Sequence, residues 1–150
     1  MSDNSIFKQN FAAIIKRAGD RADDVVRKTA WQLQGSLVER SPVGNPDLWK
    51  HPAPPGYTGG RFKNNWTVGI GAPDLSTSQG PDAFGHDAMN EAAEKLLGWK
   101  AGQPIFLTNS MPYARRLEYE GWSSQAPQGM VRLTVIEFND AVRRAAAEGR

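Results

Sequence analysis

The sequence has no cysteine, only two histidines, and no apolar run that approaches the roughly 18 residues needed to cross a membrane. The missing cysteine excludes a disulfide framework, thiolate metal sites and cysteine nucleophiles. The first ten residues, MSDNSIFKQN, are polar and lack the apolar core of a signal peptide. We therefore expect a protein that is soluble, is made in the cytosol and has no membrane partner.

A large excess of positive charge is also absent. The 18 lysines and arginines are nearly balanced by 16 aspartates and glutamates, so the formal net charge is +2, and the two signs are interleaved along the chain. Proteins dedicated to binding nucleic acid more often cluster their basic residues on one face. Charge alone is therefore only a weak indication of a nucleic-acid ligand.

The length of 150 residues suits a single domain, 1–150, and this domain begins with a long helix. Between residues 5 and 39, apolar or small side chains recur every three or four positions, as on one face of a helix: Phe7, Phe11, Ile14, Ala18, Ala22, Val25, Thr29, Leu33 and Leu37. Pro42 predicts the end of the helix, whereas Gly19 leaves open whether there is one helix or two. A helix this long often extends beyond its own core and packs on a neighbour.

Residues 41–60 predict a long loop, in which 44–60 form a proline-rich loop or arm. The stretch SPVGNPDLWKHPAPPGYTGG holds five of the ten prolines and four glycines. Leu48, Trp49 and Tyr57 are its large apolar side chains. They could form an arm that docks on another protein, or they could fold back over the core, and the composition does not decide between the two.

The rest of the chain alternates between strands and helices. Phe62, Trp66, Val68 and Ile70 share one parity, which is typical of a half-buried strand. We expect a helix at 87–97, a second strand at 103–110, a short helix at 111–119, and a final helix at 129–148. The apolar face of that final helix is expected to consist of Val131, Val135, Phe138, Val142 and Ala145. The pattern predicts an α+β fold, with the long N-terminal helix and the C-terminal helix packed on a small antiparallel β-sheet and with long loops.

Candidate metal-binding residues are few. His86, Asp87 and Asn90 could be imagined as a metal site, but adjacent residues on a helix point apart and no second histidine stands at ligand spacing. A solvated helix start, where an aspartate favours the helix dipole, explains the cluster better. We expect no metal and no cofactor.

Candidate catalytic residues are equally few. Glu118 and Glu120 suggest a pair of carboxylates, but a two-residue separation on a helix places them on different faces. We expect them to form ion pairs instead, Glu118 with Arg115 and Glu120 with Arg116. The glycine-rich segments lack the lysine or the glycine order of a nucleotide site. The sequence therefore predicts that the protein is not an enzyme, with a small hydrolase of unrecognised type as a remote alternative.

The stretch NSMPYARRLEYEGWSSQAP, residues 109–127, combines basic and aromatic side chains. Arg115, Arg116, Tyr113, Tyr119 and Trp122 could hold phosphates and stack on bases. A short helix with Tyr113 and Leu117 on its buried side and the arginines outside explains the stretch better, because the glutamates nearby would repel a phosphate backbone. Trp, Tyr and Arg also dominate the energetics of protein–protein interfaces, so an assembly surface is a third interpretation.

Three segments together resemble those of a known family: SPV at 41–43, TGGRFKNNW at 58–66, and IFLTNSMPYARRLEYEGWSSQAPQGMVRLTVIEF at 105–138. They resemble the phage HK97 gene product 10-like tail-component family of neck and tail-completion proteins, in which a long N-terminal helix precedes a PVDTG-type segment, a PYAxxLEYG-type segment, a QAPxGMV loop and a C-terminal helix. Two departures stand out. Residues 44–57 form a longer, proline-rich insert, and Glu120 precedes Gly121 where the family pattern goes straight to glycine.

The resemblance implies a structural virion protein at the head–tail junction of a tailed bacteriophage, assembled in the host cytoplasm and without catalytic activity. It implies a homo-oligomeric ring of six or twelve subunits, stacked between head-completion or connector proteins and tail-terminator or tail-tube proteins, with genomic DNA passing through the lumen. The alternative is a DNA-binding or packaging accessory protein. The candidate residues for protein–protein contact are Trp49, Tyr57, Arg115, Arg116, Tyr119 and Trp122.

Overall fold

The computed structural model describes residues 3–148 of the chain, and their side chains from residue 12 onward. Helix α1, Asp3–Arg40, runs without interruption through Gly19, so the single-helix alternative is correct. The predicted apolar positions Phe7 and Phe11 lie outside the residues whose side chains are described. The helix ends where the hydroxyl of Ser41 donates to the carbonyl of Leu37 at 2.7 Å and Pro42 follows.

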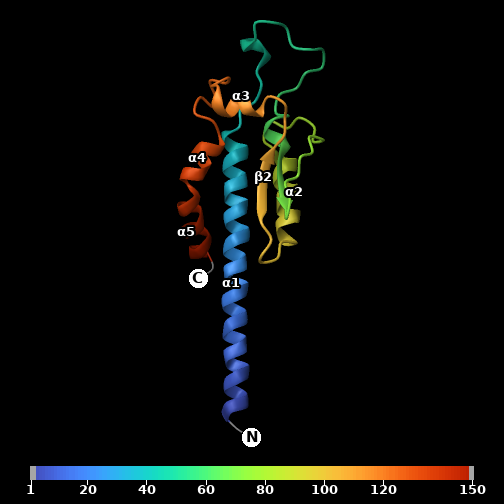
Figure 1. The fold of residues 1–150 in the computed structure, drawn as a ribbon. Helices are drawn as coiled ribbons and strands as arrows, with labels where there is room; N and C mark the ends of the chain where they lie inside the picture. Colours follow the sequence, from blue (N-terminus) through green and yellow to red (C-terminus); the bar gives the residue numbers. More distant parts are fainter. Residues whose placement is uncertain (1–2, 149–150) are drawn as a thin grey trace.

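Helix α1 is the central column of the fold (Figure 1). Strands β1 (Trp66–Ile70) and β2 (Ile105–Asn109) lie on one side of it with helix α2 (His86–Leu97), and helices α4 (Val131–Ile136) and α5 (Phe138–Glu148) lie on the other. The N-terminal half of α1 extends well beyond all of these elements. Ile14 and Ile15 on that half are 60% and 57% exposed. The expected extension of this helix beyond its core is therefore present.

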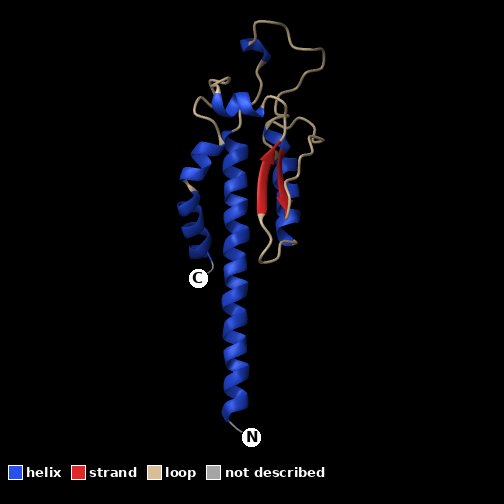
Figure 2. Cartoon of the chain, viewed as in Figure 1, coloured by secondary structure: helices blue, strands red, loops and turns tan. Residues whose placement is uncertain are grey.

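The two strands pair antiparallel (Figure 2). They do not form a hairpin, because α2 lies between them in the sequence. Trp66 is opposite Asn109, Val68 opposite Leu107, and Ile70 opposite Ile105. A two-stranded sheet is only marginally stable by itself, so it needs a cover. One apolar cluster joins Val68 to the buried side chains of α1 and α2: Ala30, Ala92 and Leu96.

A second and larger cluster lies nearer the C-terminal end of α1. It joins residues of α1, the segment before β1, β1, α2, α3 (Ala114–Tyr119) and the loops that flank α3: Leu37, Val38, Phe62, Trp66, Ala88, Met111, Leu117, Ala126 and Met130. Burying this many apolar side chains supplies the main driving force for folding. No helix within residues 3–148 has both the length and the apolarity that crossing a membrane requires.

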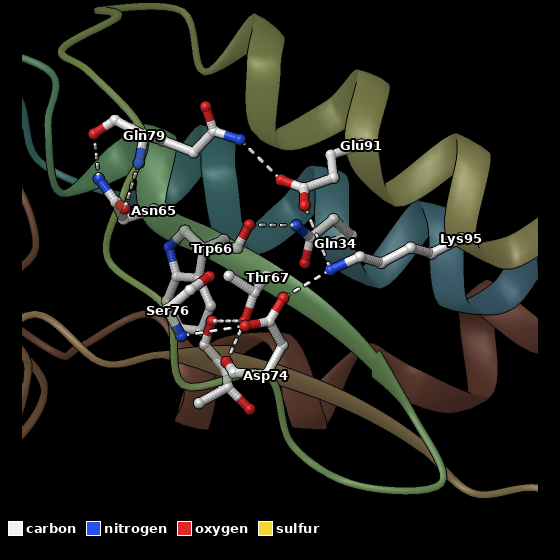
Figure 3. Close-up of polar contacts among 10 residues, drawn as sticks. Gln34, Asn65, Trp66, Thr67, Asp74, Ser76, Gln79, Glu91 and Lys95 are labelled. Carbon is white, nitrogen blue, oxygen red and sulfur yellow. Dashed lines mark hydrogen bonds and ion pairs between the residues drawn. The ribbon is translucent and has the colours of Figure 1, made fainter.

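The loop after β1 folds back along the strand and covers its other face. The hydroxyl of Thr67 donates to the carbonyl of Asp74 at 2.6 Å. A Cβ at Gly69 would collide with the backbone of Ala72, so only glycine permits this close approach. Lys95 of α2 anchors the loop, since its ammonium lies 2.6 Å from Asp74 and its hydrogen bond lowers the pKa of that carboxyl to about 2 (Figure 3).

Two adjacent asparagines, both fully buried, connect this loop to the rest of the core. The side-chain amide of Asn64 donates to the Gly80 carbonyl and to Asp87, while its oxygen accepts from the N–H of Ala88 in the first turn of α2. Asn65 binds Gln79 in both directions: its amide donates to the Gln79 carbonyl and its oxygen accepts from the Gln79 N–H (Figure 3). This short helical turn, η2 (Lys63–Asn65), therefore fixes the start of α2 and the end of the loop together.

Gln34 of α1 performs a similar role between α1 and the sheet. Its side chain is completely buried, and its amide donates to the carbonyl of Trp66 at 3.1 Å (Figure 3). The indole N–H of Trp66 in turn donates to the hydroxyl of Ser41 at 2.6 Å. Two hydrogen bonds thus link the first residue of β1 to the C-terminal part of α1.

The predicted α+β fold with a long N-terminal helix is confirmed. The finer arrangement differs, because α5 lies against α1 on the side away from the sheet. The single helix predicted at 129–148 is wrong: the chain forms α4 and α5, with Glu137 between them. The predicted apolar face is also largely wrong, since Val135 is 65% exposed whereas Thr134 is buried. Arg40 of α1 explains this change, as it donates to the hydroxyl of Thr134 and pairs with Glu137.

We expect Asn64→Ala to lower the free energy of unfolding by about 1–3 kcal/mol, because the N–H of Ala88 would remain buried without a partner and the bonds to Gly80 and Asp87 would be lost. Urea unfolding followed by circular dichroism measures this loss. Asn90→Ala on the exposed side of α2 is the matched control and should cost less than about 0.5 kcal/mol. Equal losses in the two variants would contradict the role given to Asn64.

Candidate protein-interaction site

The candidate site occupies the end of the molecule where α1 terminates, which we call the arm end (Figure 1). Three segments meet there: the arm (residues 44–60), helix α3, and the loop 120–130 between α3 and α4. They are far apart in sequence, so their meeting depends on long-range contacts.

Gln125 joins the arm to the loop. Its side-chain oxygen accepts from the N–H of Val43 at 3.1 Å, and its amide donates to the carbonyl of Val43 at 2.8 Å. The two ends of the arm also touch, because a Cβ at Gly59 would collide with the backbone of Gly44 and the side chain of Val43. The base of the arm is therefore held on both sides.

The rest of the arm extends from this base away from the core (Figure 1). Asn45 caps a short helical turn, η1 (Pro46–Leu48), by accepting from the N–H of Asp47. The rings of Trp49 and Tyr57 meet edge to face, with 4.8 Å between their centroids. Leu48 at the turn is 73% exposed. Of the two arrangements that the sequence left open, the arm projects and does not fold back over the core.

Helix α3 begins at Ala114, after a turn at Pro112 and Tyr113, and points its arginines outward. The expected ion pairs of these arginines are wrong. The guanidinium of Arg115 lies 6.0 Å from the ring centre of Tyr119, and that of Arg116 lies 4.6 Å from the ring centre of Trp122. Both aromatic side chains remain more than half exposed. These cation–π contacts hold aromatic groups in fixed positions at the surface.

Glu118 has a different partner from the one expected. Its carboxylate is buried and accepts hydrogen bonds from the backbone N–H groups of Met130, Val131 and Arg132, at 2.6, 3.0 and 3.0 Å, where α4 begins. The side chain of Arg132 pairs with it as well. Burial acts to raise the pKa of Glu118, but these donors outweigh it and hold the pKa below its ordinary value. Glu118 is therefore a structural cap for α4.

A cavity of about 870 Å³ lies between the arm and the loop 120–130. Its floor is formed by buried apolar side chains, including Phe62, Met111 and Leu117. Its walls are formed by side chains from the arm and from the loop: Leu48, Trp49, Tyr57, Trp122, Ser123 and Gln125. This volume falls within the usual range for binding sites.

Polar groups also reach the cavity. Arg61 and Tyr113 line it beside Tyr57. Burial raises the pKa of the Tyr113 hydroxyl, the neighbouring Tyr57 adds to this effect, and Arg61 opposes it. A guanidinium and two phenol groups in an apolar setting can orient a polar backbone that enters the cavity.

The structure brings together part of the predicted site. Trp49, Tyr57 and Trp122 line one cavity, whereas Arg115, Arg116 and Tyr119 lie on the outer side of α3. Tyr113, expected on the inner side of its helix, is half-buried and lines the cavity. Sequence reasoning missed Gln125, which holds the cavity wall, and Arg61, which lines the cavity. Their only signal was their position within the TGGRF and PYA…QAP segments.

The other candidate cluster gives no site. His86 lies beside Asp82, with 3.2 Å between its Nδ1 and the carboxylate, and its ring stacks on Phe84. Asp87 accepts a hydrogen bond from Asn64. Within the part of the chain whose side chains are described, no three acidic, histidine or cysteine side chains are grouped to hold a metal ion.

A substitution at Gly129 tests how closely Glu118 approaches the start of α4. It has φ of +81°, and a Cβ there would lie 2.6 Å from the Cδ of Glu118. Gly71 has φ of +80° with open space around it, so it is a matched control for backbone strain alone. We expect Gly71→Ala to cost roughly 1–2 kcal/mol, and Gly129→Ala to cost about 2 kcal/mol more because of the collision. Chemical unfolding measures both, and equal costs would exclude a tight contact at Gly129.

The capping role of Glu118 predicts a dependence on pH. Because the folded pKa lies below the ordinary 4.5, the carboxylate stabilises the fold above that pH, and this contribution disappears as the pH falls through the folded pKa. We expect Glu118→Gln to lose about 1–3 kcal/mol at pH 7 relative to the unsubstituted chain, and the difference to shrink in acid. Urea unfolding at several pH values measures it. Glu120→Gln controls for the loss of one negative charge, and a difference that did not change with pH would refute the cap.

Comparison with known proteins leaves the chain without an assigned relative. No protein-family model, no curated protein and no solved structure matches it.

Proposed function

We propose that this chain is a structural virion protein of a tailed bacteriophage, acting at the head–tail junction as a neck or tail-completion component. In this role it forms a homo-oligomeric ring, joins tail to head and lets DNA pass. It contacts head-completion or connector proteins on one side and tail-terminator or tail-tube proteins on the other. It has no catalytic role.

The observation that carries the proposal is the convergence of the segments that resemble the phage family. Gln125 of the QAP segment binds both backbone groups of Val43 in the SPV segment. Trp66 of the RFKNNW segment donates to Ser41, the first residue of SPV. Three short matches that are up to 82 positions apart thus form one connected unit. Contact among the matching segments is what the resemblance requires of them, and it supports the resemblance to that extent.

The distribution of exposed side chains also supports an assembly role. Large apolar groups are exposed on three separate parts of the chain: the projecting half of α1, the arm end, and the outer side of α4 and α5. Several exposed apolar surfaces on one small protein mark contacts with more than one neighbour. A component stacked within a ring between two other assemblies needs such contacts.

The second candidate, a DNA-binding or packaging accessory protein, has one observation in its favour. Arg115 and Arg116 are exposed and lie over exposed aromatic rings, a combination that suits contact with nucleic acid. Glu120 is exposed on the same segment and disfavours a phosphate backbone. We therefore place this candidate second.

Deleting the gene from the phage that encodes this chain tests the proposal. We expect filled heads and separate, complete tails that fail to join, seen by negative-stain microscopy of the lysate. A plasmid copy of the gene should restore infectious particles. Normal virions from the deletion strain would overturn the proposal, and empty heads would favour the packaging alternative.

The same complementation assay separates the two candidates at residue level. Arg115→Glu combined with Arg116→Glu, on the plasmid copy, should preserve DNA packaging if the protein serves as a joint. A purified chain that binds duplex DNA with a steep dependence on salt, and loses that binding in the double variant, would support the accessory role instead.

A further inference from the structure

The cavity at the arm end has the chemistry of a groove that binds proline-rich segments. Trp49, Tyr57, Tyr113 and Trp122 place four aromatic rings around it. Aromatic-lined grooves bind extended proline-rich peptides, because flat rings pack against the proline rings and the stiff peptide has little entropy to lose. The phenol and guanidinium groups in the groove can donate to the free carbonyls of such a peptide.

The same chain displays a segment of that kind. Residues 52–55 are Pro-Ala-Pro-Pro, and all three prolines are exposed. Each proline fixes its own φ near −65° and disfavours helical backbone at the preceding residue. Residues 52–54 accordingly form a run without turn or bend, and a turn closed by the N–H of Tyr57 on the carbonyl of Pro54, at 3.0 Å, ends it. The segment is therefore a preformed ligand for an aromatic groove.

The segment does not occupy the groove of its own chain. Leu48, Trp49, Tyr57 and Thr58 line that groove, whereas residues 50–56 do not. The prolines of the arm are exposed, while the base of the arm is fixed by Gln125. The prolines are thus presented to a second molecule.

We propose that the proline segment 51–55 of one copy docks in the aromatic groove of the next copy, head to tail. Donor and groove both lie at the arm end of the molecule (Figure 1). A rotation about an axis parallel to α1 can therefore bring the arm of one copy to the groove of its neighbour at the same height. A heterologous contact of this kind repeats around the axis and gives a ring where the rotation between copies closes.

Only the closure of these contacts into a ring rests on the proposed function. The docking itself is a property of the isolated protein and can fail or succeed separately. Deletion of the gene tests the role in the virion, whereas the experiments below test only the contact between copies.

Because the chain has no cysteine, the contact can be trapped by a disulfide. Two purified single variants, Ala53→Cys in the arm and Ser124→Cys in the groove wall, are mixed under mild oxidation. We expect a cross-linked dimer in the mixture, on a non-reducing gel, at least fivefold more abundant than with Ala147→Cys as the groove partner. Ala147 is exposed at the far end of α5. A mixture with no excess over this control overturns the inference, whatever oligomer the unsubstituted protein forms.

Complementation between two defective variants tests the direction of the contact. One variant carries Pro52→Ala and Pro55→Ala, which damages the arm, and the other carries Trp122→Ala, which damages the groove. Each should self-associate at least tenfold more weakly than the unsubstituted chain by light scattering. Mixed together, they should form 1:1 dimers and nothing larger, because only one intact arm and one intact groove can meet. Circular dichroism checks that both variants fold, and a folded arm variant that associates normally would overturn the inference.

Discussion

The sheet and the helices α2, α4 and α5 depend on the last third of α1. A pair of five-residue strands and a six-residue helix cannot bury enough surface to be stable alone. Residues 29–41 supply that surface, since α2 and the sheet lie on one side and α5 on the other. Ala30 and Leu37 are buried in the contacts. Because one helix serves both layers, the layers should unfold together rather than separately.

Hydrogen bonds from buried polar groups determine how each layer sits on this column. Apolar contact is not directional, so it cannot by itself choose one register over another. Gln34 links the first residue of β1 to α1. Asn64, in the turn just before β1, binds the start of α2. On the opposite side, Arg40 binds Thr134 and Glu137, the residues around which α4 ends and α5 begins. Each layer thus has its own polar link to the central helix.

The difference between apolar packing and polar links explains which elements the sequence could predict and which it could not. Residue type and apolar periodicity located α1, α2 and β2 to within a few residues. The first strand was predicted from Phe62, but it begins at Trp66, because residues 63–65 form the helical turn η2. The C-terminal helix was misread because Arg40, about 94 positions away, makes burial of Thr134 favourable while Val135 faces outward. Glu118 was misread for the same reason: its donors lie 12–14 residues along the chain, beyond any local spacing rule. Polar side chains that bind distant backbone have no periodic signature.

At the candidate site, the sequence predicted the exposed aromatic residues but not their convergence. Trp49 and Trp122 line one cavity because Gln125 holds the loop against Val43, and this contact is invisible in a pattern of apolar residues. The consequence is a rigid base that carries a projecting tip. Binding costs free energy when a flexible loop must be ordered, and a base already held by hydrogen bonds reduces that cost. The proline-rich part of the arm therefore lies where a contact would bind with a small entropic loss.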